Sequence, residues 1–320
     1  MKTNPIRRFF RENMGILLAL AAIILFWAVN PFTSRAFLQT QNLLNVLRQI
    51  STNALLACGM TMVIILGGID LSVGAVVALS GCVSAGCVLF YGIPAAPAML
   101  IGILVGVLIG AFNGLLISKT TIPAFIVTLA TMNIARGLAK VYTGGNPLSV
   151  SLDAWKWIGA GYTAGVPNPV WVMLLVLIVT GVLMNNTRFG RHLYAVGGNP
   201  RAARFSGIRV ERVQFLVHTF SGLMAGIAGV IIASRMYTGS SSAGESMEMD
   251  AIAAVVVGGT SMAGGSGKLG GTVIGCLIIG FLDNGLNLMN VDSFWQYVVK
   301  GVVILLAVLL DFLRSKSKRR

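Results

Sequence analysis

The chain has 320 residues, of which 56% are hydrophobic and 11% are charged, and its mean hydropathy is +0.83. Soluble domains carry about 25% charged residues, so this composition excludes a soluble domain with the usual polar surface. The formal net charge of +14 does not indicate nucleic acid binding, because the basic residues flank apolar segments, where membrane topology and anionic lipid explain them.

Apolar segments along the whole chain predict an all-α fold, a single transmembrane domain over residues 1–320. We expect a helical core over 14–312 and a basic tail over 313–320. Interrupting residues divide the core into ten predicted spans, at 15–31, 46–67, 71–90, 94–117, 122–142, 169–186, 213–234, 250–263, 270–289 and 294–312. Most of the 24 Lys and Arg residues fall on one side of the membrane if the N-terminus is cytoplasmic. An even number of spans then places both termini in the cytoplasm.

Polar side chains within the spans are candidates for a solute path, because they are costly in hydrocarbon. Asp70 precedes the third span, where its carboxylate can either accept from free backbone N–H groups or contact a solute. Five amides suit a neutral, polyhydroxylated solute, at Asn53, Asn113, Asn133, Asn284 and Asn287. They suit hydrogen bonds between helices equally well. Asp283, Lys300 and Arg136 are charged exceptions, and Lys300 can either snorkel or pair within the bundle.

The fourth span carries a stripe of glycines at four-residue spacing, namely Gly102, Gly106, Gly110 and Gly114. Residues four apart lie on one face of a helix, and glycines on such a face let a neighbouring backbone approach closely. The stripe therefore predicts tight helix packing.

The predicted external segment Gly144–Asn168 carries three aromatic residues, Trp155, Trp157 and Tyr162, between Gly and Pro residues. Aromatic side chains of this kind commonly lie at the membrane–water interface. A surface for an extracytoplasmic partner is the alternative interpretation.

The basic segment Arg188–Arg212 interrupts the apolar pattern and is predicted to be cytoplasmic. Asn199 is a good N-cap, Pro200 suits the first helical turn, and Gly207 can adopt the left-handed conformation that ends a helix. These signals predict a helix over Pro200–Ser206, which is too short to be stable alone. A short basic helix in a cytoplasmic segment indicates contact with a partner.

No catalytic constellation or metal-ligand spacing is visible in the sequence. The glycine-rich segment Gly264–Leu269 resembles a phosphate-binding loop, but Met262 stands where its first glycine belongs and Leu269 where Ser or Thr would bind magnesium. We expect a cytoplasmic turn there and no cofactor bound by this chain. The preceding span, 250–263, is short for a crossing, so a tilted, broken or partly re-entrant helix is also open.

Several motifs in combination resemble a known transporter family. They are Ala57-Cys58-Gly59-Met60-Thr61, Gly68-Ile69-Asp70-Leu71-Ser72-Val73-Gly74, Gly197-Gly198-Asn199 with Ser206-Gly207-Ile208, the run from Asp250 to Ser261, and the run from Gly280 to Leu288. From about residue 15 to 312, the chain is similar to the membrane subunit of ribose-type ABC sugar importers. Nothing in the sequence names the sugar itself.

This resemblance implies a non-catalytic permease of the bacterial inner membrane. It implies a homodimer in the lipid bilayer, placed on two nucleotide-binding subunits that bind ATP and Mg²⁺, and supplied by an extracytoplasmic sugar-binding protein. The segment 188–212 would then be a coupling loop that contacts the ATPase through Asn199, Pro200, Arg201, Ala202, Ala203, Arg204 and Gly207. Many such permeases carry a Glu-Ala-Ala loop, whereas this chain has Arg201-Ala202-Ala203 and lacks that glutamate.

An ion-coupled secondary transporter of a small polar solute is the alternative function. Such transporters usually need paired acids and bases within the membrane. Asp70 and Asp283 are too few to favour that class. A channel is favoured still less.

Overall fold

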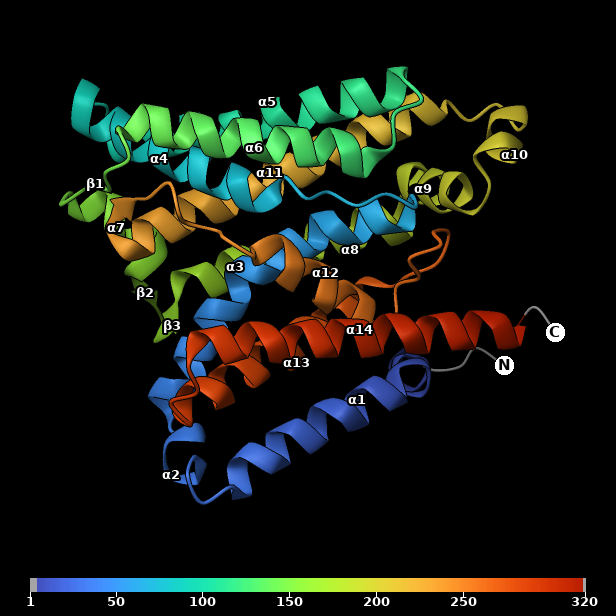
Figure 1. The fold of residues 1–320 in the computed structure, drawn as a ribbon, viewed down its shortest axis with the longest axis horizontal. Helices are drawn as coiled ribbons and strands as arrows, with labels where there is room; N and C mark the ends of the chain where they lie inside the picture. Colours follow the sequence, from blue (N-terminus) through green and yellow to red (C-terminus); the bar gives the residue numbers. More distant parts are fainter. Residues whose placement is uncertain (1–4, 319–320) are drawn as a thin grey trace.

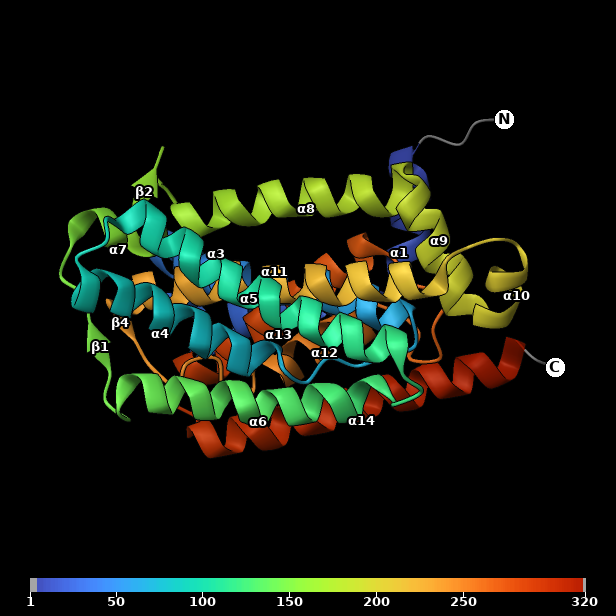
Figure 2. The same cartoon turned by 90° about the horizontal axis from the view of Figure 1, so that it is seen from above.

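The computed structural model describes residues 5–318 and is mostly helical, with long helices that pack side by side along one axis (Figure 1; Figure 2). The helices are α1 (Pro5–Val29), α2 (Ser34–Phe37), α3 (Thr40–Ile65), α4 (Val73–Tyr91), α5 (Ala95–Lys119), α6 (Ala124–Thr143), α7 (Asp153–Ala160), α8 (Asn168–Asn186), α9 (Arg188–Gly198), α10 (Pro200–Phe205), α11 (Val210–Met236), α12 (Met247–Val257), α13 (Leu269–Leu288) and α14 (Ser293–Lys318). The short strands are β1 (Leu148–Ser149), β2 (Tyr162–Thr163), β3 (Val166–Pro167) and β4 (Thr238–Gly239). Strand β1 pairs antiparallel with β4, and β2 pairs antiparallel with β3.

The two ends of the bundle differ in character. Helices α2 and α7 and the short strands lie at one end, on the left of Figures 1 and 2. Helices α9 and α10 lie at the other end, where α1 also begins and α14 ends. The basic segment therefore shares one end of the molecule with both ends of the described chain.

The described part of the chain contains six helices that are long and apolar enough to cross a membrane, namely α4, α5, α6, α8, α11 and α13. The apolar stretches Asn13–Val29 in α1 and Ser293–Leu306 in α14 are shorter. Each of the ten predicted spans overlaps a helix of the structure. These features indicate a multi-pass membrane protein, while the number of crossings stays a prediction.

Helix α12 occupies the predicted span that was short for a crossing. It has 11 residues, which at 1.5 Å per residue is about half of the roughly 30 Å hydrocarbon core. It ends at Val257, where Gly258 and Gly259 turn the chain and Gly259 has a φ of +85°. The segment is thus a broken helix followed by turns. The backbone of the turns is held in part by α3, since Gly265 N–H donates to the Ile65 carbonyl at 2.8 Å.

The glycine stripe of α5 packs chiefly against α11. A Cβ atom at Gly106 would lie 2.7 Å from the Gly226 Cα, and one at Gly110 would lie 2.8 Å from the Gly222 Cα. Gly114 faces the backbone of Phe215 on α11, and all four glycines of the stripe are buried. The two backbones are therefore too close for any side chain at the crossing.

The segment between α6 and α8, which the sequence predicts to be external, is folded more tightly than its sequence indicates. Trp155 on α7 is fully buried and donates from Nε1 to the Ser84 hydroxyl of α4 at 3.2 Å. Ser234 of α11 donates to the Trp155 carbonyl at 2.7 Å. An interfacial position for Trp155 is therefore wrong, because its indole packs in the core, whereas Trp157 and Tyr162 are exposed.

The crossing of α5 and α11 predicts a large effect of side-chain volume. Replacing Gly110 by Leu should force the helices apart and lower the yield of folded protein, because overpacking costs about 1–3 kcal/mol even where the surroundings can move. Leu104 is 53% exposed on the same helix, so Leu104→Ile is the matched control and should be mild. Yield and thermal unfolding in detergent check both variants. A Gly110→Leu protein with wild-type yield and unfolding temperature would contradict the packing role of the stripe.

Candidate functional site

A cavity of about 390 Å³ lies between α3, α11, α12 and α13. Polar and apolar side chains alternate around it, and the lining residues are Gln49, Ile50, Thr52, Asn53, Ile232, Arg235, Met236, Met247, Asp250, Cys276, Gly280 and Asp283. Among the predicted path residues, only Asn53 lies in this wall. The cavity is thus built from three consecutive helices, α11 to α13, and from α3, which is far from them in sequence.

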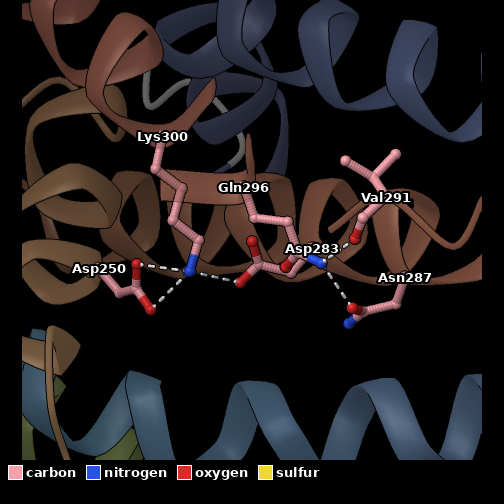
Figure 3. Close-up of polar contacts among 6 residues, drawn as sticks. All are labelled: Asp250, Asp283, Asn287, Val291, Gln296 and Lys300. Atoms are coloured by element: carbon pink, nitrogen blue, oxygen red, sulfur yellow. Dashed lines mark hydrogen bonds and ion pairs between the residues drawn. The ribbon is translucent and has the colours of Figure 1, made fainter. Parts of the chain in front are cut away.

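An ion-pair cluster joins three helices at one side of the cavity (Figure 3). Lys300 of α14 lies between two carboxylates, with its Nζ atom 2.9 Å from Asp250 Oδ1 of α12 and 3.1 Å from Asp283 Oδ2 of α13. The sequence left open whether Lys300 snorkels or pairs, and the structure shows that it pairs. The Lys300 side chain is only 19% exposed, and a cation in membrane surroundings is stabilised by such partners.

A second polar cluster surrounds Asp70, which is 1% exposed. Its Oδ1 atom accepts from the backbone N–H and the hydroxyl of Ser72, at 3.0 and 2.6 Å, and its Oδ2 atom accepts from the Ser221 hydroxyl at 2.8 Å. Asn113 donates to Ser72 Oγ at 3.0 Å and accepts from the Thr131 hydroxyl at 2.6 Å. Asp70 and Asn113 therefore hold together the start of α4, α5, α6 and α11, away from the cavity lining.

Three other predicted amides have hydrogen-bond partners outside both clusters. Asn284 exchanges two hydrogen bonds with Asn42 of α3, at 3.0 and 2.8 Å. Asn287 is exposed and accepts from Gln296 at 2.8 Å (Figure 3). Asn133 is exposed on α6 and donates to the Leu129 carbonyl of its own helix at 3.0 Å. The six predicted path residues thus do not form one continuous path within a single chain.

Helix α10, at the end of the bundle opposite α7 and the short strands (Figure 1; Figure 2), has the predicted local structure. The Asn199 side chain accepts from the Ala202 backbone N–H at 3.0 Å, Pro200 is in the first turn, and Gly207 has a φ of +81°. Arg204 pairs with Glu211 of α11. The capping signals therefore place the helix correctly, with an end at Phe205 rather than Ser206.

The outer face of α10 differs from the one expected from sequence. Ala203 is 4% exposed and packs against Val196 and Val210 of its own chain. It therefore cannot face a partner, because its methyl group already belongs to the core beneath α10. Phe205 is 92% exposed, and Ala202 is exposed beside it. Phe205 is not among the contact residues predicted from the sequence. A large aromatic residue in a basic segment is the signal that could have identified it.

Helix α9 replaces the first part of the predicted loop. The Thr187 hydroxyl caps it by accepting from the Gly190 N–H at 3.2 Å, and Gly190, Leu193 and Val196 form its buried face. This spacing places all three residues toward the bundle. This helix was not predicted from the sequence, because its three glycines lower its intrinsic helix propensity, whereas tertiary packing stabilises it.

Tyr194 connects α9 to the turn that precedes α13. Its hydroxyl donates to the Gly267 carbonyl at 2.9 Å, and burial raises the pKa of Tyr194, so the donor stays protonated. A Cβ atom at Gly197 would lie 2.9 Å from the Gly265 nitrogen and would collide with the Ile65 carbonyl of α3. Helix α9 is therefore in direct contact with the C-terminal end of α3 and with the turn before α13, and both of these helices also line the cavity.

Comparison with solved structures identifies the fold. The chain matches a transporter described as being of the metal-chelate ABC type, in an inward-facing conformation, with a TM-score of 0.55 and 13% identity. The match covers 92% of this chain and 99% of that chain. At this low identity, the likeness concerns the fold alone.

Comparison of sequences identifies the family. Residues 42–308 match the family described as "Branched-chain amino acid transport system / permease component". The chain is 48% identical to the ribose import permease protein of Bacillus subtilis strain 168, over 96% of this chain and 94% of the relative. It is 45% identical to the ribose import permease protein of Escherichia coli K12, over 95% and 96% of the two chains. It is 38% identical to the xylose transport system permease protein of the same strain, over 96% and 93%. The chain therefore belongs to this family of transport-system permease components, as the ribose-type motifs in its sequence predict.

Proposed function

We propose that this chain is the membrane-spanning permease subunit of an ATP-driven ABC importer, and that it passes a monosaccharide, ribose or a related sugar, from a binding protein into the cytoplasm. The observation that carries the proposal is the 48% identity with a ribose import permease over 96% of this chain. The 38% identity with a xylose permease supports the wider class of pentoses. Permease components are non-catalytic transport subunits, so ATP and Mg²⁺ belong to a partner ATPase.

The proposed assembly contains two copies of this permease in the bacterial inner membrane, with ten spans and cytoplasmic termini. The shared location of the basic segment, the start of α1 and the end of α14 supports this orientation (Figure 1). The apolar windows of α5, α6 and α8 are only 33%, 28% and 39% buried within one chain. Their outer faces are therefore available for lipid and for a second copy.

The proposed contact with the ATPase is the outer face of α10. Phe205 and Ala202 are three residues apart and exposed, so they present one apolar surface between arginines. An aromatic side chain of this kind is a common anchor in a protein interface. A contact of this type needs no glutamate in the loop.

Movement of the ATPase would reach the cavity through α9. When ATP binding closes the nucleotide-binding dimer, the docked α10 would move with it and carry α9. Helix α9 contacts the end of α3 and the turn before α13 through Gly197 and Tyr194. A shift of these two helices would change the cavity between them and switch its access from one side of the membrane to the other.

The orientation predicts the labelling of single cysteines by an impermeant maleimide in whole cells. On a background without the four native cysteines, which are all buried, cysteine at Ser242 or Ser151 should react, because both positions are exposed on the external side. Cysteine at Ser206 should react only after permeabilisation. Strong labelling at Ser206 with none at Ser242 would reverse the proposed orientation.

The docking surface predicts that Phe205→Ala weakens ATPase binding. Removal of a phenyl group that is buried in the complex costs about 1.5–3 kcal/mol, so co-purification of the ATPase should fall about tenfold or more and sugar uptake should be lost at normal membrane abundance. Phe32→Ala is the matched control, because Phe32 is 81% exposed and directly precedes α2, which lies at the opposite end of the molecule from α10 (Figure 1). Equal ATPase retention in both variants would exclude Phe205 as an anchor.

Reconstitution tests the transport function itself. Proteoliposomes that contain the permease, its ATPase and the binding protein should accumulate D-ribose only when ATP is present on the ATPase side. Permease alone in an imposed proton or sodium gradient is the control and should accumulate none. Gradient-driven uptake without the ATPase would instead establish a secondary transporter.

A further inference from the structure

We propose that the cavity between α3, α11, α12 and α13 is a weak binding site for a neutral, polyhydroxylated solute within the permease, with Asp283 and Asn53 as its hydrogen-bond acceptors. This inference rests on the proposed function, because it names the place where the imported sugar contacts this chain. It adds residues and a location that the likeness to other permeases does not supply.

Two residues that line the cavity each keep a buried oxygen without a hydrogen-bond partner. Asp283 is 6% exposed, and its Oδ2 atom pairs with Lys300, but its Oδ1 atom has no partner. Asn53 Oδ1 has none either. Buried acceptors are normally satisfied, and an unpaired one is costly. Both oxygens are closed to water in this conformation. Because Asn53 and Asp283 line the cavity, a small rotation of each side chain would bring its oxygen to the O–H donors of a ligand there.

The carboxylates of Asp70 and Asp283 differ in how completely the protein satisfies them. Both carboxylates are buried, yet each oxygen of Asp70 accepts from serine groups of the protein. The chain therefore satisfies a buried acid where the acid has a packing role. At Asp283 it leaves one oxygen unpaired, and that residue lies in the wall of a cavity.

The charges around the cavity favour an uncharged ligand. The carboxylates of Asp250 and Asp283 are opposed by the ammonium group of Lys300 and the guanidinium group of Arg235. Gln49 of α3 adds a neutral amide to the wall. The formal charges of these two acids and two bases cancel, so this set of four groups does not favour a cation or an anion by net charge. Arg48, which interacts with Arg235, adds a positive charge nearby, and this further disfavours a cation. Vicinal hydroxyl groups, which donate and accept, match such a mixed wall.

Lys300 acts as a positioning residue in this arrangement. It contacts both carboxylates at once, at 3.0 Å from Asp250 Oδ2 and 3.1 Å from Asp283 Oδ2 (Figure 3). The ammonium group of Lys300 contacts only Oδ2 of Asp283, so Oδ1 has no partner in the protein. The three helices α12, α13 and α14 are thereby held in one geometry at the site.

The size and access of the cavity suit a monosaccharide. Its volume of about 390 Å³ lies within the range of about 300–1,000 Å³ that is usual for small-molecule sites. Gln49 and Met236 are exposed, so the cavity is open at its edge. Arg235 and Met236 form the last turn of α11, at the end opposite α10. In the proposed orientation this is the half of the membrane that faces the binding protein.

Binding of D-ribose to the purified full-length permease in lipid nanodiscs tests the inference. Equilibrium dialysis with labelled D-ribose should show weak, saturable binding by the wild type. Asn53→Leu removes one acceptor at similar volume without a change of charge, and the dissociation constant should rise about tenfold or more, as for the loss of one buried hydrogen bond. Ribose 5-phosphate should compete at least about tenfold less well than D-ribose.

Asn133→Leu is the matched control, because it makes the same substitution at an exposed amide outside the cavity. Binding is compared only between variants whose thermal unfolding temperature equals that of the wild type. If Asn53→Leu does not fold, Asp283→Asn serves instead, since Asp250 still pairs with Lys300.

Absence of saturable binding, or equal binding by the Asn53→Leu and Asn133→Leu proteins, would mean that the cavity holds only water and would overturn the inference. A complete importer that takes up ribose at the wild-type rate with Asn53→Leu would likewise overturn it while leaving the proposed function intact. Failure of the complete wild-type importer to transport ribose would count against the proposed function itself.

Discussion

The contact between the backbones of α5 and α11 is the constraint on which the rest of the structure depends. Lipid supplies no hydrophobic driving force between helices, so close van der Waals contact must hold them together. Gly106 and Gly110 meet Gly222 and Gly226 at distances that exclude side chains. Farther along α11, Gly229 lies equally close to the backbone of α4. Helix α11 is thereby fixed on two sides, and it connects α10 at one end with the cavity wall at the other.

Polar groups inside the bundle divide into two kinds. The groups around Asp70 satisfy one another and join helices, which lets a buried carboxylate remain in an apolar setting. The groups around Asp283 satisfy one another only in part and border open space. The first kind stabilises one packed arrangement. The second kind lines the cavity where we propose that a solute binds, on helices α3 and α13 that α9 contacts through the end of α3 and the turn before α13.

Much of this architecture could be predicted because its signals are local. The glycine spacing on α5, the cap at Asn199 and the left-handed Gly207 each depend on residues close in sequence. Apolar run length places a helix in every predicted span, but it cannot decide how far α12 penetrates. Whether Trp155 is buried depends on Ser84 and Ser234, which are far from it in sequence. The same limit applies to the cavity and to the direction of Ala203, since both are set by tertiary packing.

The exposure of Phe205 has a consequence for the life of the protein before assembly. A side chain that is 92% exposed, at the end of the bundle that we propose to be cytoplasmic, presents apolar surface to water. In a permease that has not yet bound its proposed partner, the Phe205 side chain thus stays exposed. Exposed apolar surface of this type is recognised by cellular quality control. If the permease were synthesised in excess of the ATPase that we propose to cover Phe205, the side chain would stay exposed in the excess permease. The lifetime of those molecules would then be shorter. We therefore expect the amount of permease to be set by its partner as well as by its gene.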